Sequence, residues 1–195
     1  MKRRARYEDL MQVPDHLVAE IIDGELVTSP RPASPHAWAS SIIGQDLAPF
    51  GGRPTNPGAP GWWWILDEPE LHFAEDVLVP DLAGWREERM PRVPSVAYFT
   101  LAPDWVCEVI SPRTGRIDRS KKMAIYAREG VPYLWFVDPL ARTLEIYRLE
   151  GARWMVVATH GGDDLVRAEP FAALELALDR WWLESADPIS EVCSR

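Results

Sequence analysis

The sequence predicts an α/β fold with a mixed central sheet that is flanked by helices. Residues 105–111 are apolar and rich in strand-favouring types, residues 117–129 follow as a helix, and residues 133–137 form a second apolar run. A strand, a crossover helix and a second strand make a parallel unit whose strands are buried on both faces. The turn signals Asp23-Gly24 and Glu150-Gly151 add one hairpin before this unit and one after it.

The remaining elements follow from breakers and apolar runs along the chain. Pro112 and Gly115 separate the first central strand from the helix, and Gly130 and Pro132 end that helix. Before this unit we expect a short helix at 7–12, strands at 17–22 and 25–28, a helix at 36–47, and strands at 62–66, 71–73 and 77–85. After it we expect a hairpin of strands 143–149 and 153–159 and a short helix or turn at 171–182.

Composition is typical of a globular protein with a substantial core. The chain has 195 residues, 47% of them hydrophobic, and ten are tryptophans. This predicts one domain over residues 1–195, with a core at about 7–160 and a C-terminal extension at 161–195. No apolar run is long enough to span a bilayer and no signal peptide is recognisable, so we expect no membrane partner. Two cysteines, one of them in a predicted core strand, indicate a reduced, cytoplasmic protein. The cysteines, Cys107 and Cys193, form no metal-binding spacing.

The net charge of −9 argues against generic nucleic-acid binding, in which basic surfaces supply most of the affinity. It leaves open a site where a divalent cation offsets a group of carboxylates. It also leaves open a local basic patch on an acidic body.

Glu108 is the residue that does not fit its predicted strand. Side chains alternate across a strand, so Glu108 shares a face with the apolar Val106 and Ile110. A buried carboxylate is costly unless it is paired, protonated or bound to a metal. Glu108 is therefore either an ion-paired or edge-exposed residue, or a metal-binding or catalytic carboxylate with a partner elsewhere.

Asp81 is the candidate partner. It follows Pro80 and enters a predicted strand upstream of Glu108. A Pro-Asp pair followed by a Glu in a later apolar strand is the outline of a PD-(D/E)xK nuclease core. Two carboxylates suit Mg²⁺, or Mn²⁺ in its place, because such ions prefer oxygen ligands and keep several waters. In this chemistry the metal activates a water, and a nearby lysine positions that water or neutralises charge.

Several further segments together resemble the Uma-two family of restriction-endonuclease-like proteins. They are Glu20-Ile21-Ile22-Asp23-Gly24-Glu25, Pro35-His36, Val79-Pro80-Asp81, Glu108-Val109-Ile110-Ser111-Pro112, Asp118 with Lys122 and Tyr126, and the stretch from Gly130 to Pro139. The resemblance covers about residues 7–160 and implies a restriction-endonuclease-like fold, Mg²⁺ and a nucleic-acid substrate. It places Asp81 and Glu108 on the acidic pair that binds metal, Glu20 on the acidic residue of the first strand, and Lys122 on the helix lysine.

The chain departs from the general nuclease pattern at Ile110. The usual lysine stands two residues after the glutamate, and Ile110 occupies that position. The resemblance implies that Lys122, which matches the family's helix lysine, replaces it, and Asp118, Lys122 and Tyr126 recur every four residues and form one helix stripe. The alternatives are that Lys122 pairs with Asp118 at the surface and that Tyr126 only packs.

Cations gather next to Glu108. Lys122 aside, they are Arg113, Arg116, Arg119 and Lys121. They form either a solvated helix face or a set of phosphate contacts for nucleic acid. Similar pairs of alternatives stay open for His36, which packs near a helix start or joins the site, and for residues 62–64, three tryptophans that fill the core or stack on bases.

Three functions remain in competition at this point. The leading one is a Mg²⁺-dependent endonuclease that hydrolyses phosphodiester bonds in DNA. The second is a non-catalytic nucleic-acid-binding or interaction module that keeps the fold, which the missing strand lysine and the acidic charge favour. The third is a metal-free hydrolase that uses two carboxylates as acid and base. The sequence does not decide between DNA and RNA, and it leaves a homodimer open.

Overall fold

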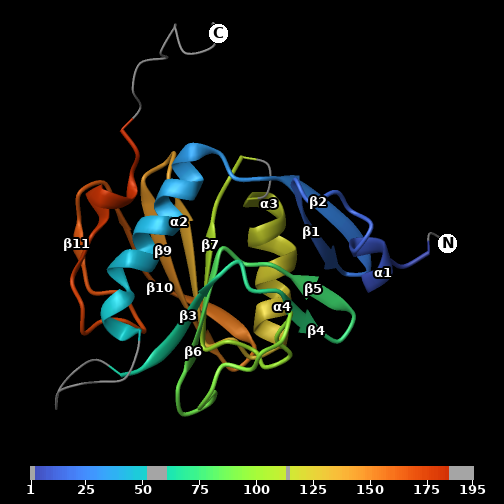
Figure 1. Cartoon of the computed structure of the whole chain (residues 1–195). Coiled ribbons are helices and arrows are strands. Elements are labelled where there is room, and N and C mark those ends of the chain that lie inside the picture. The colour runs from blue at the N-terminus through green and yellow to red at the C-terminus, as the bar shows by residue number, and fades with distance from the viewer. Residues whose placement is uncertain (1–2, 52–60, 113–114, 185–195) are drawn as a thin grey trace, which may run out of the picture.

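The computed structural model describes residues 3–51, 61–112 and 115–184 (Figure 1). The helical elements are α1 (Tyr7–Leu10), α2 (Ser34–Asp46), η1 (Ala48–Phe50), α3 (Gly115–Ile117), η2 (Asp118–Lys122), α4 (Met123–Arg128) and η3 (Leu178–Trp181). The strands are β1 (Leu17–Ile22), β2 (Glu25–Pro30), β3 (Trp63–Asp67), β4 (Leu71–Phe73), β5 (Asp76–Leu78), β6 (Leu82–Arg86), β7 (Trp105–Val109), β8 (Tyr133–Asp138), β9 (Thr143–Glu150), β10 (Arg153–Gly161), β11 (Leu165–Val166) and β12 (Leu176–Ala177).

A six-stranded mixed sheet lies at the centre of the fold. Its strand order is β10-β9-β8-β7-β6-β3, and its parallel pair is β7 and β8, in which Glu108 lies opposite Phe136. The other pairs are antiparallel, including the β9–β10 hairpin and the β6–β7 pair. The sequence prediction of a strand–helix–strand unit and a following hairpin is therefore confirmed.

A second sheet of four strands has the order β2-β1-β5-β4. Its β1–β2 hairpin turns at Asp23 and Gly24, which both have positive φ angles, of 54° and 75°. Two central residues with positive φ are characteristic of the tight turn whose twist matches that of antiparallel strands. This hairpin brings Glu20 on β1 close to the central sheet.

The strand expected at 77–85 is in fact two strands in two different sheets. β5 pairs with β1 and β4 in the four-stranded sheet, whereas β6 pairs with β3 and β7 in the six-stranded sheet. Pro80 has no backbone N–H with which to continue a ladder, so pairing stops there. Asp81 consequently lies at the crossing point between the sheets and not inside a strand.

Two hydrophobic clusters cover the two faces of β7. On one face Trp105 and Cys107 pack with α2 and with the C-terminal segment that carries Phe171 and Trp181. On the other face Val106 and Ile110 pack with Ile125 and Tyr126 of α4. Figure 1 shows α2 and the α3–α4 helix on opposite sides of β7. Glu108 shares the second face, as alternation predicts, so it points toward α4.

The crossover helix is not a regular α-helix over residues 117–129. Its middle section, η2, is a π turn in which the Met123 N–H donates to the Asp118 carbonyl, five residues back. Such wide turns inside helices often occur at functional sites. Here the π turn contains both Asp118 and Lys122, which are buried.

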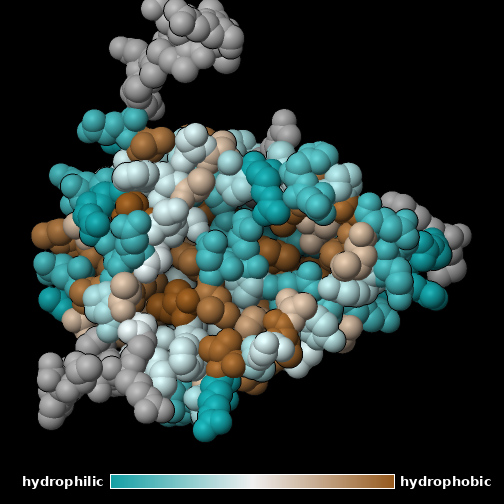
Figure 2. All heavy atoms as spheres, viewed as in Figure 1, coloured by the Kyte–Doolittle hydropathy of each residue, from teal (hydrophilic) through white to brown (hydrophobic). Residues whose placement is uncertain are grey.

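Polar residues cover most of the surface seen in Figure 2, with hydrophobic residues gathered over β3. In the part of the chain that the structure describes, no helix has both the length and the apolar character needed to cross a membrane.

Candidate active site

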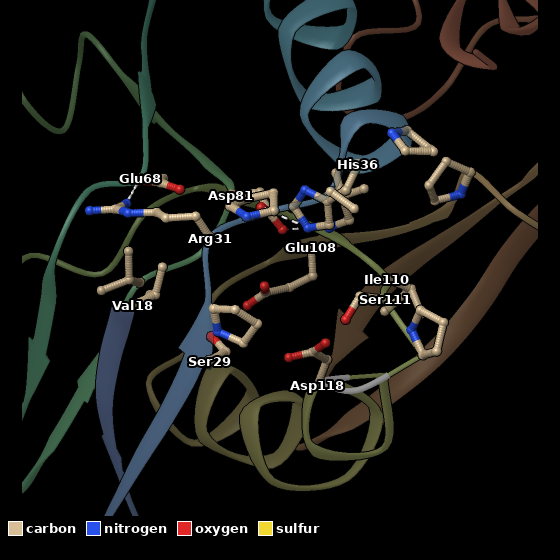
Figure 3. Close-up of a pocket in the computed structure, with 18 of the residues that line it drawn as sticks. Val18, Ser29, Arg31, His36, Glu68, Asp81, Glu108, Ile110, Ser111 and Asp118 are labelled. Carbon is tan, nitrogen blue, oxygen red and sulfur yellow. Dashed lines mark hydrogen bonds and ion pairs between the residues drawn. The ribbon is translucent and has the colours of Figure 1, made fainter. Parts of the chain in front are cut away.

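A cavity of about 540 Å³ lies where the two sheets, α2 and η2 meet. Its lining includes the carboxylates of Glu20, Asp81, Glu108 and Asp118 and the ammonium of Lys122. Figure 3 shows Glu108 between Asp81 and Asp118, with its carboxylate directed into the open space. The first-strand glutamate, the acidic pair and the helix lysine that the sequence singles out therefore surround one cavity.

Lys122 is the centre of the charged cluster. Its Nζ lies 2.9 Å from Glu20 Oε1, 3.2 Å from Glu108 Oε1 and 3.4 Å from Asp118 Oδ1. Its exposed side-chain fraction is 5%, so the surface pair with Asp118 that the sequence left open is not what forms. The neighbouring Lys121 turns outward to Glu25 and Asp23. Lys122 rather than Lys121 is thus the lysine placed at Glu108.

The charged side chains in this cluster shift one another's pKa values. Burial raises the pKa of Glu108 well above its ordinary value, and nearby carboxylates add to the shift against the attraction of Lys122. Burial lowers the pKa of Lys122, but Glu108, Glu20 and Asp118 together outweigh burial and hold it well above its ordinary value. Three acids around one ammonium leave an excess of negative charge, which favours both a firmly charged lysine and proton uptake by one acid.

Tyr126 and a backbone amide orient the acidic residues. The Tyr126 hydroxyl donates to Glu108 Oε1 at 2.6 Å, so this tyrosine both packs in the core and takes part in the site. The Val79 N–H donates to Glu20 Oε1 at 2.8 Å. Burial, followed by the charge of Glu108, raises the pKa of Tyr126 well above its ordinary value, which keeps the hydroxyl protonated as a donor.

Asp81 is held by groups from two other elements. Its Oδ2 accepts the Val109 N–H at 2.7 Å, and its Oδ1 lies 3.2 Å from His36 Nε2 at the start of α2. Burial lowers the pKa of His36, but the hydrogen bond and charge of Asp81 outweigh that effect and raise it. His36 therefore contacts Asp81 and lines the cavity, and its part in the function of the site stays a prediction.

The donors suit a hard divalent cation by their chemistry. Carboxylate oxygens are the preferred ligands of Mg²⁺, which is commonly held by one or two carboxylates together with waters and substrate phosphates. Among the described residues no group of three or more His, Cys, Asp or Glu side chains is arranged as a ready-made metal cage. A two-carboxylate site at Asp81 and Glu108 needs no such cage.

Two of the four cations predicted to contact phosphate already pair with acidic side chains. Arg119 donates two hydrogen bonds to Glu145, at 2.7 and 2.6 Å, and Lys121 pairs with Glu25 at 3.2 Å. Both cations are thus already engaged with acids, which the sequence did not indicate. Arg116 is exposed, and Arg113 lies outside the described residues.

Arg31 is a cavity residue that the sequence analysis did not select. It lines the mouth of the cavity and pairs with Glu68 at 3.0 Å (Figure 3). The available signal was its position: it is a lone cation in the proline-rich loop between the strand pair of Glu20 and the helix of His36.

The pair of Arg119 and Glu145 also fastens the π turn to the central sheet, and it predicts a pH-dependent stability. The hydrogen bond from Arg119 lowers the pKa of Glu145 in the folded protein. This stabilisation is present above the ordinary pKa of a glutamate and is lost as the pH falls through the lowered folded value. We expect Glu145→Gln to reduce the free energy of unfolding by up to about 1 kcal/mol near neutral pH and progressively less in acid.

Denaturant unfolding at several pH values checks this expectation. Glu150→Gln on the same strand is the control, because Glu150 pairs with Arg148 but is 54% exposed, against 20% for Glu145. A Glu145→Gln deficit that stays constant down to acid pH would show that the pair with Arg119 does not depend on the carboxylate charge.

The fold and the site together define a restriction-endonuclease-like protein. A solved structure with the same fold is titled a putative nuclease belonging to DUF820, from Anabaena variabilis; it is 22% identical, with a TM-score of 0.71, and the match covers 91% of this chain and 97% of that one. The sequence profile of the family Uma2, described as "putative restriction endonuclease", matches residues 5–179, so the chain belongs to the Uma2 family. A search of curated proteins finds none that matches.

Proposed function

We propose that this chain is a Mg²⁺-dependent endonuclease that hydrolyses phosphodiester bonds in DNA. The observation that carries the proposal is the cavity in which Asp81 and Glu108 lie together with the buried Lys122. Family membership supports a nuclease activity, and the donor chemistry of the cavity supports Mg²⁺, or Mn²⁺ in its place.

The roles of the residues follow from their contacts. Asp81 and Glu108 would hold the cation, which when bound would supply positive charge to the phosphate and a water of lowered pKa. Tyr126 and Lys122 fix the orientation of Glu108, and the Val109 N–H and His36 fix that of Asp81. Because these supports are buried or part-buried, the two carboxylates are held in place before substrate arrives, which is the condition for effective electrostatic catalysis.

Lys122 also bears on the alternative of a non-catalytic module. The absence of a strand lysine at Ile110 favours that alternative from sequence. The Lys122 ammonium lies 3.2 and 3.3 Å from the two Glu108 oxygens, so a cation from the helix lies beside Glu108. We therefore rank the nuclease above the binding module.

A cleavage assay separates the three functions. The purified protein is incubated with DNA and RNA oligonucleotides of the same sequence in Mg²⁺, in Mn²⁺ and in EDTA, beside Glu108→Gln. We expect cleavage of DNA in either metal, none in EDTA, and a loss of at least about a hundredfold in the variant. Cleavage that persists in EDTA would indicate the metal-free hydrolase, and binding without cleavage would indicate the module.

A further inference from the structure

The size of the cavity restricts what can reach the carboxylates. Its volume of about 540 Å³ corresponds to a cube roughly 8 Å on an edge, and the acids lie inside it. The major groove of duplex DNA alone is about 12 Å wide. A duplex is wider still, because it includes the two backbones that border the groove, so it is too wide to lie inside this cavity, whereas one nucleotide of a single strand has a suitable size.

The walls of the cavity are unlike a surface built for a duplex backbone. Five prolines line it, at positions 30, 32, 35, 112 and 139, together with Val18, Ile110 and the exposed Leu140. Prolines have fixed φ angles and no backbone N–H, so they form a stiff and largely apolar wall. Apolar walls with a few convergent polar groups are typical of a pocket that encloses one small organic group.

The cations among the described lining residues are few for an extended phosphate track. Duplex DNA carries one negative charge per about 1.7 Å and requires arrays of cations. Among the described lining residues the cationic side chains are Arg31, His36 and Lys122. Lys122 is surrounded by carboxylates and His36 is paired with Asp81, so both are committed within the site.

Arg31 differs from these two because its present partners hold it weakly. It is 55% exposed, pairs with the 35% exposed Glu68, and makes one longer bond of 3.3 Å to the Asp15 carbonyl. Exposed ion pairs of this kind contribute little, so the guanidinium can exchange Glu68 for another anion. A guanidinium at the mouth of the cavity matches the geometry of a phosphate.

We propose that the substrate is single-stranded DNA, with one nucleotide inside the proline-lined cavity and a neighbouring phosphate on Arg31. This inference rests on the proposed nuclease function and specifies its substrate class. A strand displaced from a duplex, such as a flap or an unpaired end, meets the same requirement.

The test compares DNA substrates of one sequence as a single strand, as a flap on a duplex and as a blunt duplex, in Mg²⁺. We expect the single strand and the flap to be cut at least about tenfold faster than the duplex. A duplex cut as fast as the single strand, or faster, overturns the inference and leaves the nuclease function standing. If no DNA is cut, the nuclease function fails. In that case fluorescence anisotropy in EDTA measures the binding of the same labelled DNA substrates. Duplex binding that is as tight as single-strand binding, or tighter, overturns the inference about the substrate class.

Arg31→Gln provides a second measurement. We expect it to raise the KM for the single strand about tenfold with little change in kcat, and Arg31→Lys to restore part of the loss. Arg167→Gln is the matched control, because Arg167 is 56% exposed and pairs with Glu175 away from the cavity. An unchanged KM in Arg31→Gln would remove Arg31 from substrate binding.

Discussion

Replacing Lys122 by alanine is expected to lower the free energy of unfolding by roughly 3–5 kcal/mol, as well as to abolish cleavage. The reason is that Glu20, Glu108 and Asp118 all lie within 3.4 Å of its ammonium and are buried. Without Lys122, three carboxylates face one another without a counter-charge. Because Lys122 is itself buried, the variant is expected to lose stability together with cleavage.

Denaturant unfolding of three variants tests the stability effect. Lys121→Ala is the control, because Lys121 forms exposed pairs that contribute less than about 1 kcal/mol. The double variant Lys122→Met/Glu108→Gln should regain a large part of the lost stability, since it removes one buried charge along with the cation, and it should stay inactive. An unfolding midpoint for Lys122→Ala equal to that of the wild type would show that Lys122 does not hold these charges together.

The second large effect is expected for Asp81→Asn, which should reduce cleavage at least about a hundredfold with little loss of stability. An asparagine oxygen can still accept the Val109 N–H, so the local structure has the bond it needs. The variant lacks the negative charge that a metal ion requires. It also relieves like-charge repulsion near Glu108, which offsets part of the lost pairing with His36.

Asp104→Asn is the contrasting control. Asp104 is also part of the β6–β7 region, but it accepts the Arg86 N–H and pairs with Arg89 outside the cavity. Loss of such charge-assisted bonds should cost about 1.5–3 kcal/mol, while the activity per folded molecule stays at the wild-type level. If the two variants showed the same ratio of activity loss to stability loss, Asp81 would be a structural residue.

Local patterns were sufficient to predict most elements of the fold. The hairpins at Asp23-Gly24 and Glu150-Gly151 and the parallel unit of β7 and β8 each depend on turn chemistry and periodicity within one segment. The division of residues 77–85 between two sheets could not be predicted, because it depends on which distant strands pair with β5 and β6. The π turn was also absent from the prediction, which gave one continuous helix over residues 117–129.

The residues of the candidate site could likewise be predicted only in part from the sequence. A glutamate on an apolar strand face and a Pro-Asp pair are local signals, so Glu108 and Asp81 could be selected from sequence. Arg119 and Lys121 appeared as available cations because their partners, Glu145 and Glu25, are far away in the chain. Arg31 was missed because its one signal was indirect, namely the position of its loop between the elements that carry Glu20 and His36.

The position of Lys122 between the two sheets also has a consequence for folding. Its ammonium contacts Glu20 of the four-stranded sheet and Glu108 of the six-stranded sheet. These two glutamates lie far apart in the amino-acid sequence. Contacts of such high contact order are costly in loop-closure entropy and tend to form late. Recovery of the proposed cleavage activity would therefore report the joining of the sheets, and it should lag behind the return of secondary structure when the denatured protein is refolded.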